Sequence, residues 1–378
     1  MTTGRTFVGG RVVAPTGVLD GASVRVLGDT IAEVGTGLAP GRDDDVVDVR
    51  GAWLLPGFID MHMHGGGGHD VTTSAEAMRA AVQFHRGAGT TRTLVSLVAA
   101  PASALVEQLG WIAQLTADGT VLGGHLEGPF LARSRCGAQN PAHLIAPDPA
   151  LLARLYAAAS GSLRMMTIAP ELPGALEVVR EAVSRGVITA LGHSDATYDQ
   201  AWAAIEAGAS VATHLFNGMR GLHHREPGLV GAALAAGLAC ELINDGVHVH
   251  PAMARLVDNL VLVTDAIDAA GVGDGDYTLG GQHVAVRDGI AQLETGTLAG
   301  STATMAAAVR RTVRDSGLSV PAASYAASGR PAAVLGVADR YGAIAPGLAA
   351  DLVILAADLE VSGVLVGGEW STPVVTSR

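Results

Sequence analysis

The sequence contains no lysine, because all 24 of its lysine-plus-arginine positions are arginines. A P-loop nucleotide-binding protein needs its lysine, a pyridoxal-phosphate enzyme needs a lysine for the Schiff base, and a protein kinase needs its strand lysine. These three classes are therefore excluded. A pair of metal ions bridged by a carbamylated lysine is excluded for the same reason.

Cysteine, aromatic residues, positive charge and long apolar runs are also scarce. The two cysteines, Cys136 and Cys240, are far apart and form no C-x-x-C pair, which excludes a disulfide framework and a cysteine zinc site. Only 4% of residues are aromatic and the net charge is −12, which argues against nucleic acid or an anionic membrane as partner. No run of 18 apolar residues and no apolar N-terminal segment is present, so we expect a cytoplasmic protein.

A length of 378 residues suits one large barrel with a small additional domain. Eight apolar, strand-like runs alternate with alanine-rich helical stretches after Pro56-Gly57, which favours a (β/α)8 TIM-type barrel, a fold of the α/β class. A doubly wound sheet is the alternative, but it gives no reason for eight repeats. The runs are 58–64, 91–97, 121–127, 164–170, 187–193, 210–216, 238–246 and 260–267.

The pattern also predicts where the domains begin and end. Residues 56–339 form the expected barrel, interrupted by a β excursion near residues 276–297. Residues 1–55 and 340–378 are rich in short strands, and we expect them to pair into one small discontinuous β domain. The helices that we expect span 74–87, 101–118, 149–159, 173–185, 198–208, 251–259, 301–316 and 324–335.

Residues of metal-ligand or acid/base type stand at or near the ends of five of the eight runs. Such ends converge at one mouth of a barrel, where barrels of this type place their chemistry. Four histidines and two carboxylates at that mouth predict a divalent metal site with an additional acid/base group. These residues are His62, His64, Glu127, His193, His214 and Asp265. The remaining histidines are expected to be surface or structural, among them His69, His85, His125, His250, His283 and the pair His223-His224.

Eight segments resemble the amidohydrolase superfamily and, within it, the N-acetylglucosamine-6-phosphate deacetylases. The combination of HLEGP and HLFN is specific to that group, whereas His-x-His alone is not. The resemblance implies a β sandwich beside the barrel. The segments are PGFIDMHMHG (56–65), GGHLEGPFL (123–131), ALGHSDAT (190–197), THLFNGM (213–219), REPGL (225–229), NDGVHV (244–249), LVTDAI (262–267) and TLAGSTATM (297–305).

The resemblance implies roles for these residues. Glu127, His193 and His214 would hold one divalent metal ion, with zinc expected first and iron, cobalt or manganese as alternatives. His62 and His64 would hold a second ion bridged by Glu127, so that one or two ions are bound per subunit. The metal would lower the pKa of a bound water, and Asp265 would move protons from that water to the leaving amine.

The resemblance also implies a set of substrate contacts, and this chain departs from the family at two of them. Gln139 stands where the family often has a histidine, and glutamine can donate a hydrogen bond but cannot transfer a proton. Gly218 stands where alanine is common. We interpret Cys136, in the segment after the third run, as a spectator thiol. The implied contacts are Ala138, Gln139, Asn217, Gly218, Arg225, His248, Leu298, Ala299 and Gly300.

The implied reaction is hydrolysis of N-acetyl-D-glucosamine 6-phosphate to D-glucosamine 6-phosphate and acetate, in amino-sugar catabolism and cell-wall recycling. A homodimer is expected, with Arg225 reaching the neighbouring subunit's site. Two alternatives share the architecture: a deacetylase for the galacto epimer and a cyclic-amide hydrolase. A non-catalytic scaffold on the same barrel is the alternative from another class, but such proteins usually lack the ligand residues present here.

Overall fold

A computed structural model describes residues 4–374 of the chain. Eight strands form a parallel sheet in the order β15-β14-β13-β12-β11-β10-β9-β6. A parallel bridge between Met63 and Ala266, just beyond β6 and β15, joins the two ends of this order. The predicted barrel is therefore confirmed. Its strands are β6 (Phe58–Asp60), β9 (Thr90–Leu97), β10 (Gly123–Glu127), β11 (Leu163–Ile168), β12 (Ile188–Leu191), β13 (Val211–Ala212), β14 (Ala239–Ile243) and β15 (Leu260–Val263).

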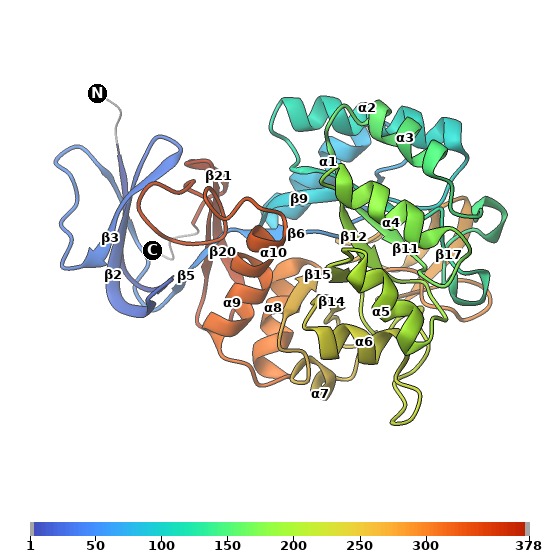
Figure 1. Cartoon of the computed structure of the whole chain (residues 1–378). Helices are drawn as coiled ribbons and strands as arrows, with labels where there is room; N and C mark the ends of the chain where they lie inside the picture. The colour runs from blue at the N-terminus through green and yellow to red at the C-terminus, as the bar shows by residue number, and fades with distance from the viewer. Residues whose placement is uncertain (1–3, 375–378) are drawn as a thin grey trace. The chain divides into compact units, whose positions relative to one another are not determined.

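Helices follow the strands, and Figure 1 shows α2 to α6 on the outside of the barrel. Helix α6 was not predicted, because its residues are almost all small or apolar and give no polar face for a helical period to reveal. Helix α7 is much shorter than the predicted 251–259 segment. The helices are α1 (Ala75–Gly87), α2 (Ala102–Ala117), α3 (Pro149–Ala158), α4 (Ala175–Ser184), α5 (Tyr198–Glu206), α6 (Gly228–Ala236) and α7 (Pro251–Ala254).

A three-stranded antiparallel sheet interrupts the barrel sequence after β15. It consists of β16 (Gly275–Leu279), β17 (Gln282–Arg287) and β18 (Ile290–Gln292). Its inner face forms an apolar cluster with Ile267 and Ala299, two residues that flank it in the sequence. The Gln282 side chain donates a hydrogen bond of 2.6 Å to the carbonyl oxygen of Ala138. This sheet therefore helps to hold the segment that carries Ala138.

A second, mainly antiparallel sheet combines strands from both ends of the chain. Its order is β21-β20-β19-β5-β1-β2-β3, with β4 attached to β1, and β5 pairs with β19 across the two ends. Strand β1 links the two halves of this path, because its first half pairs with β4 and its second half pairs with β5, on either side of bulges near Gly10. Side chains from both halves, among them Val24 of β2 and Leu352 of β19, share one apolar core, in agreement with the implied β sandwich. The strands are β1 (Arg5–Ala14), β2 (Gly17–Leu27), β3 (Thr30–Thr36), β4 (Asp45–Asp48), β5 (Trp53–Pro56), β19 (Leu352–Leu355), β20 (Val361–Val366) and β21 (Glu369–Thr372).

The chain divides into two compact units. One comprises Met1–Asp60, Gln83–Arg92 and Thr304–Arg378, and the other comprises Met61–Val82 and Thr93–Ala303. The first unit includes helices α8 (Met305–Arg314), α9 (Val320–Ala327) and α10 (Gly329–Val334). The predicted domain boundaries at 55/56 and 339/340 were placed where the sequence pattern changes, whereas these units are defined by compactness. The predicted boundaries therefore stay a prediction. Within residues 4–374, no helix is long and apolar enough to span a membrane.

Candidate metal centre and active site

The predicted ligand residues lie at or just beyond the carboxyl ends of the barrel strands. Glu127 is the last residue of β10, while His193, His214 and Asp265 each lie two residues after β12, β13 and β15. The backbone φ angles of these three residues are 46°, 27° and 48°, a left-handed conformation that residues with side chains rarely adopt. Such strain persists only where the surroundings impose it, and it is frequent at functional sites. The strands are therefore shorter than predicted, because the chain turns at each of these residues.

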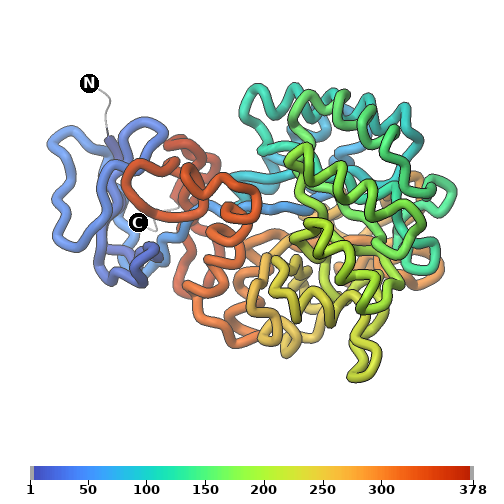
Figure 2. The backbone as a smooth tube through the Cα atoms, viewed as in Figure 1, coloured from blue at the N-terminus to red at the C-terminus, as the bar shows by residue number. Residues whose placement is uncertain are grey.

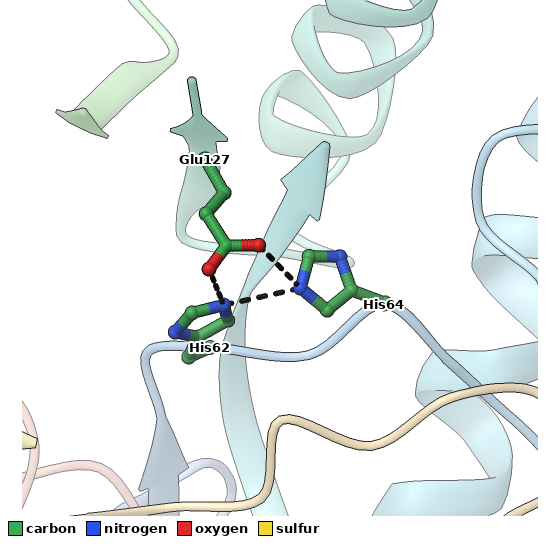
Figure 3. Close-up of side chains that lie close together, drawn as sticks. All are labelled: His62, His64 and Glu127. Atoms are coloured by element: carbon green, nitrogen blue, oxygen red, sulfur yellow. Dashed lines mark hydrogen bonds and ion pairs between the residues drawn. The ribbon is translucent and has the colours of Figure 1, made fainter. Parts of the chain in front are cut away.

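The first ligand group is formed by His62, His64 and Glu127. Figure 3 shows the two imidazole rings and the carboxylate facing one another. The Nε2 atoms of His62 and His64 are 3.1 Å apart, and the His64 Nε2 lies 3.2 Å from Oε2 of Glu127. The His62 Nε2 lies 3.5 Å from Oε1 of the same carboxylate. All three side chains are buried, so their donor atoms face one another rather than solvent.

The second ligand group shares Glu127 with the first. Its Oε1 lies 2.9 Å from Nε2 of His193 and 3.0 Å from Nε2 of His214. These two imidazole nitrogens are themselves 3.1 Å apart. In each of the two groups, one donor atom from each residue lies within 4.8 Å of the others. The Glu127 carboxylate therefore lies between the two histidine pairs, which is the position that a bridging ligand would need.

The hydrogen bonds of the imidazole rings show that the donor set fits a divalent cation. The Nδ1 atom of His64 donates to the Ser96 carbonyl oxygen at 3.0 Å, and that of His193 donates to the Arg135 carbonyl oxygen at 2.9 Å. An oxygen that can only accept requires a proton on Nδ1 of each ring, so a metal ion would be bound through Nε2. The facing Nε2 atoms and the Glu127 carboxylate need positive charge among them, which protons on the rings or a bound cation would supply. Imidazole and carboxylate donors suit zinc and several other divalent metals.

The remaining predicted acid/base group lies beside the first ligand group. The Asp265 Oδ1 is 3.2 Å from Nε2 of His64 and 3.5 Å from Nε2 of His62. Burial alone would raise the pKa of Asp265, but these imidazoles outweigh burial and hold that pKa below its ordinary value. Burial would likewise raise the pKa of Glu127, whereas His62 and His193 keep it well below its usual range. These shifts favour the ionised form of both carboxyl groups, which is the form that a ligand and a general base require.

Gln139 fixes the carboxylate of Glu127 from the other side. Its side-chain oxygen accepts a hydrogen bond of 2.8 Å from the backbone N–H of Ala99. That contact orients the amide so that Nε2 donates to Oε2 of Glu127 at 2.5 Å. The glutamine that departs from the family pattern thus acts here as an oriented hydrogen-bond donor.

A cavity of about 200 Å³ opens over these residues. Among the predicted substrate contacts, Arg225 and Ala299 do not line it: Ala299 is buried in the apolar cluster beneath the three-stranded sheet. Gly218 has a φ of +58°, which glycine adopts more readily than the alanine common in the family, and a Cβ there would lie 3.0 Å from Nδ1 of His193. The lining comprises His64, Glu127, Gly137, Ala138, Gln139, His193, His214, Asn217, Gly218, Ile243, His248, Asp265, Leu279, Thr297, Leu298 and Gly300.

His248 presents an imidazole ring at this cavity, paired with Asp245. Its Nδ1 lies 2.7 Å from Oδ2 of Asp245, and the other oxygen of Asp245 accepts the backbone N–H of His248 at 2.9 Å. Burial would lower the pKa of His248, but the Asp245 carboxylate outweighs it and raises the pKa above its ordinary value. A protonated imidazole fixed in this way is suited to an anionic group of a ligand.

Arg225 lies apart from the metal ligands of its own chain. It is exposed, its guanidinium contacts His224 at 2.9 Å, and it lines a separate cavity with Arg220 and Glu226. Figure 2 shows the segment between β13 and α6, which carries Arg225, extending outward as an open loop. Cys136 packs against a small apolar cluster and does not line the main cavity.

The sequence analysis missed Glu241 and the cavity-lining residues Gly137, Ile243, Leu279 and Thr297. Glu241 is fully buried and contacts His62. Its signal was a lone carboxylate inside an otherwise apolar strand, ACELI. His125, expected to be surface or structural, is fully buried and bonded to the hydroxyls of Ser96 and Thr167 at 2.9 and 2.8 Å.

Comparisons with known proteins agree with this geometry. A model of the amidohydrolase family matches residues 53–371. The chain is 40% identical over 330 residues to an N-acetylgalactosamine-6-phosphate deacetylase of Escherichia coli O157:H7, covering 84% of this chain and 88% of that protein. It is 38% identical over 324 residues to an N-acetylglucosamine-6-phosphate deacetylase of Bacillus subtilis (strain 168), covering 82% of each. The structure also matches that of an N-acetyl-D-glucosamine-6-phosphate deacetylase of Mycobacterium smegmatis, which was solved as an aspartate-to-alanine mutant in complex with N-acetyl-D-glucosamine 6-phosphate. The TM-score is 0.94 at 39% sequence identity, and the match covers 98% of this chain and 100% of that one.

Proposed function

This chain belongs to the amidohydrolase family, and from that membership we propose that it hydrolyses N-acetyl-D-glucosamine 6-phosphate to D-glucosamine 6-phosphate and acetate. One observation carries the proposal: two histidine groups share Glu127, and Asp265 lies beside them at a single cavity. Relatives named for this reaction support the choice of substrate. Its place would be amino-sugar catabolism and cell-wall recycling in the cytoplasm.

The five ligand residues would hold one or two divalent cations, zinc first among them. Glu127, His193 and His214 would form one site, and His62, His64 and the shared Glu127 the other. A divalent cation, when bound, supplies the Lewis acidity that activates water near neutral pH and polarises an amide carbonyl. The residues of the chain bind and orient the cations and supply the proton transfers.

Asp265 would carry the proton through the reaction. As the water oxygen bonds to the acetamide carbon, the ionised carboxylate accepts the proton that the water loses. The same carboxyl group then donates that proton to the amine nitrogen as the carbon–nitrogen bond breaks. Gln139 would donate a hydrogen bond near the reacting carbonyl, in place of the histidine that is common in the family.

The 6-phosphate would be recognised locally, because the net charge of −12 gives no long-range attraction for an anion. His248 would contact the phosphate within the cavity of its own chain. Arg225 is exposed on an outward loop, and we assign it to the phosphate of a neighbouring subunit in a homodimer. Arginine presents a planar fork that matches phosphate oxygens. Asn217, Gly218 and the 298–300 segment would complete the substrate contacts.

The galacto epimer, N-acetyl-D-galactosamine 6-phosphate, is the second candidate substrate. The observation in its favour is the 40% identity to a relative named as a deacetylase for that sugar. The two sugars differ only in the configuration of one hydroxyl group, which leaves the acetamide and phosphate contacts unchanged. The choice between them therefore depends on groups that face the 4-hydroxyl.

A panel of N-acetylhexosamines tests both the reaction and the phosphate requirement. We expect acetate release from N-acetylglucosamine 6-phosphate with a much higher kcat/KM than from N-acetylglucosamine. Binding energy from the phosphate can be expressed in kcat as well as in KM, so both should deteriorate without it. Equal kcat/KM for the two sugars would reject the phosphate site and the substrate together. A higher kcat/KM for the galacto epimer would favour the second candidate.

Replacing Arg225 by alanine should weaken turnover of the phosphorylated sugar selectively. We expect a loss of about 2–5 kcal/mol in transition-state stabilisation, the scale of a lost charge-pair contact, and almost no effect on the neutral sugar. The exposed Arg255, at the end of α7, provides a control, since Arg255→Ala removes the same charge elsewhere. Equal losses for both sugars would refute a phosphate contact.

The assignment of Arg225 to a neighbouring subunit can be tested by mixing variants. A heterodimer of Arg225→Ala and Asp265→Asn subunits contains one site that is intact at both residues only if Arg225 acts across the interface. We therefore expect activity to reappear on mixing the two impaired proteins. No recovery in confirmed heterodimers would place Arg225 outside the partner's site.

A further inference from the structure

We propose that Glu241 is a positioning residue, which orients His62 for metal binding and connects the two ligand groups. The inference rests on the proposed metal site and concerns a side chain that does not line the cavity. Glu241 lies in β14, and its side chain has no exposed surface. It therefore acts through other residues rather than on the substrate.

The contact with His62 determines which nitrogen faces the site. Oε2 of Glu241 lies 3.1 Å from Nδ1 of His62, and a carboxylate can only accept a hydrogen bond from that nitrogen. A proton consequently sits on Nδ1, which leaves Nε2, facing His64 and Glu127, as the nitrogen that would bind a metal ion. Figure 3 shows this arrangement, with the second nitrogen of the His62 ring facing away from the two partners drawn. Carboxylates that hold a ligand histidine in this way raise its basicity and fix its ring.

The backbone of His62 is held separately, which leaves ring rotation as the freedom that Glu241 removes. The carbonyl oxygen of His62 accepts the backbone N–H of Asp265 at 2.8 Å. A pinned backbone still allows the imidazole to turn about its side-chain bonds. The hydrogen bond to Glu241 selects one of those orientations.

Glu241 also reaches the second ligand group. The same oxygen accepts the backbone N–H of His214 at 3.3 Å, and the backbone carbonyl of Glu241 accepts the N–H of Leu215 at 2.7 Å. His214 has a φ of 27°, so this turn needs contacts that impose it. One buried carboxylate thus holds the ring of a ligand in one group and the backbone of a ligand in the other.

The charge of Glu241 fits the same role. A buried carboxylate is costly unless a positive charge or hydrogen bonds compensate it, and Oε1 of Glu241 has no hydrogen-bond partner within residues 4–374. Glu127 and Asp265 are two further buried carboxylates in the same region. Three negative charges around four imidazoles favour divalent cations.

His125 provides a matched control. It is also fully buried, and its ring lies 4.7 Å from that of His62, centroid to centroid. Its two nitrogens bond to the hydroxyls of Ser96 and Thr167, and no hydrogen bond joins it to a ligand side chain within the described residues. A variant at His125 therefore perturbs the buried polar layer without releasing His62.

The test is a titration of the metal-free variants with Zn²⁺ against a chromophoric chelator, which needs no substrate. Glu241→Asp keeps the charge but withdraws it by one methylene, and we expect the Kd of one zinc equivalent to rise by about 10–100-fold. Glu241→Gln keeps an acceptor at full length, so a smaller rise is expected. His125→Gln should bind both equivalents as the unchanged protein does. Thermal unfolding of the metal-free proteins checks that each variant is folded.

Several outcomes would overturn the proposal. Unchanged zinc affinity in both Glu241 variants would show that the residue does not position His62. An equal loss in His125→Gln would show a general effect of disturbing the barrel interior. If the unchanged protein binds no zinc through His62, as judged by identical stoichiometry in His62→Ala, the two-metal site itself fails. That last result differs from a failure of Glu241 alone, and neither bears on whether the sugar phosphate is the substrate.

Discussion

Asp265→Asn is expected to bind metal normally and to lose about 10²–10⁴-fold in kcat, the usual contribution of a general base. Asparagine preserves the shape of the side chain but cannot accept the proton of the attacking water. The Asp265 carboxylate lies beside His62 and His64, at 3.5 and 3.2 Å, yet it belongs to neither ligand group. The measurement combines steady-state acetate release with elemental analysis of the purified variant.

Asp268→Asn is the matched control for this experiment. Asp268 lies three residues further along the same loop, is only half-buried and does not line the cavity. Its loss should leave turnover near that of the unchanged protein. Near-normal kcat in Asp265→Asn at full metal occupancy would remove Asp265 from its assigned role, whereas loss of metal would make it a ligand instead.

His193→Ala or His214→Ala should abolish activity, while the double change His62→Ala/His64→Ala should leave a measurable fraction of it. The first pair forms the site that the family resemblance marks as indispensable, together with Glu127. The His-x-His pair would hold the second ion, which some family members lack. We therefore expect the double variant to lose one metal equivalent by elemental analysis and to keep the other.

The metal content of the double variant decides how this experiment is interpreted. Unchanged stoichiometry would mean that His62 and His64 are not a ligand pair, despite Nε2 atoms 3.1 Å apart. Complete inactivity with one ion still bound would make the second ion essential. Full activity in His193→Ala would contradict the assignment of the indispensable site.

The convergence of the candidate site residues could be predicted because barrel topology maps sequence position onto space. When eight strands alternate with helices in a closed barrel, the carboxyl ends of all the strands lie at the same end of the barrel. His193, His214 and Asp265 are far apart in the chain, yet each follows a strand by two residues and all line one cavity. The ligand types at those positions were therefore sufficient to predict a shared site.

Other features depended on contacts that no local pattern encodes. Glu241 had the appearance of an interruption in an apolar strand, and only the pairing of β14 beside β13 brings its side chain to His62 and His214. Gln139 gains an orientation because the backbone of Ala99, on another loop, donates to its oxygen. Helix α6 lacks a polar face, so its periodicity was hidden.

The sequence by itself therefore determined the fold class, the absence of any lysine chemistry and the residue types at the mouth of the barrel. These properties follow from composition and from the period of apolar residues, which are local. The tertiary structure decided which nitrogen of each histidine faces its neighbours, in which direction the pKa values of Glu127 and Asp265 shift, and where Arg225 lies. Those properties depend on hydrogen bonds and charges between residues distant in sequence, and only the closed barrel brings such residues within a few ångströms of each other.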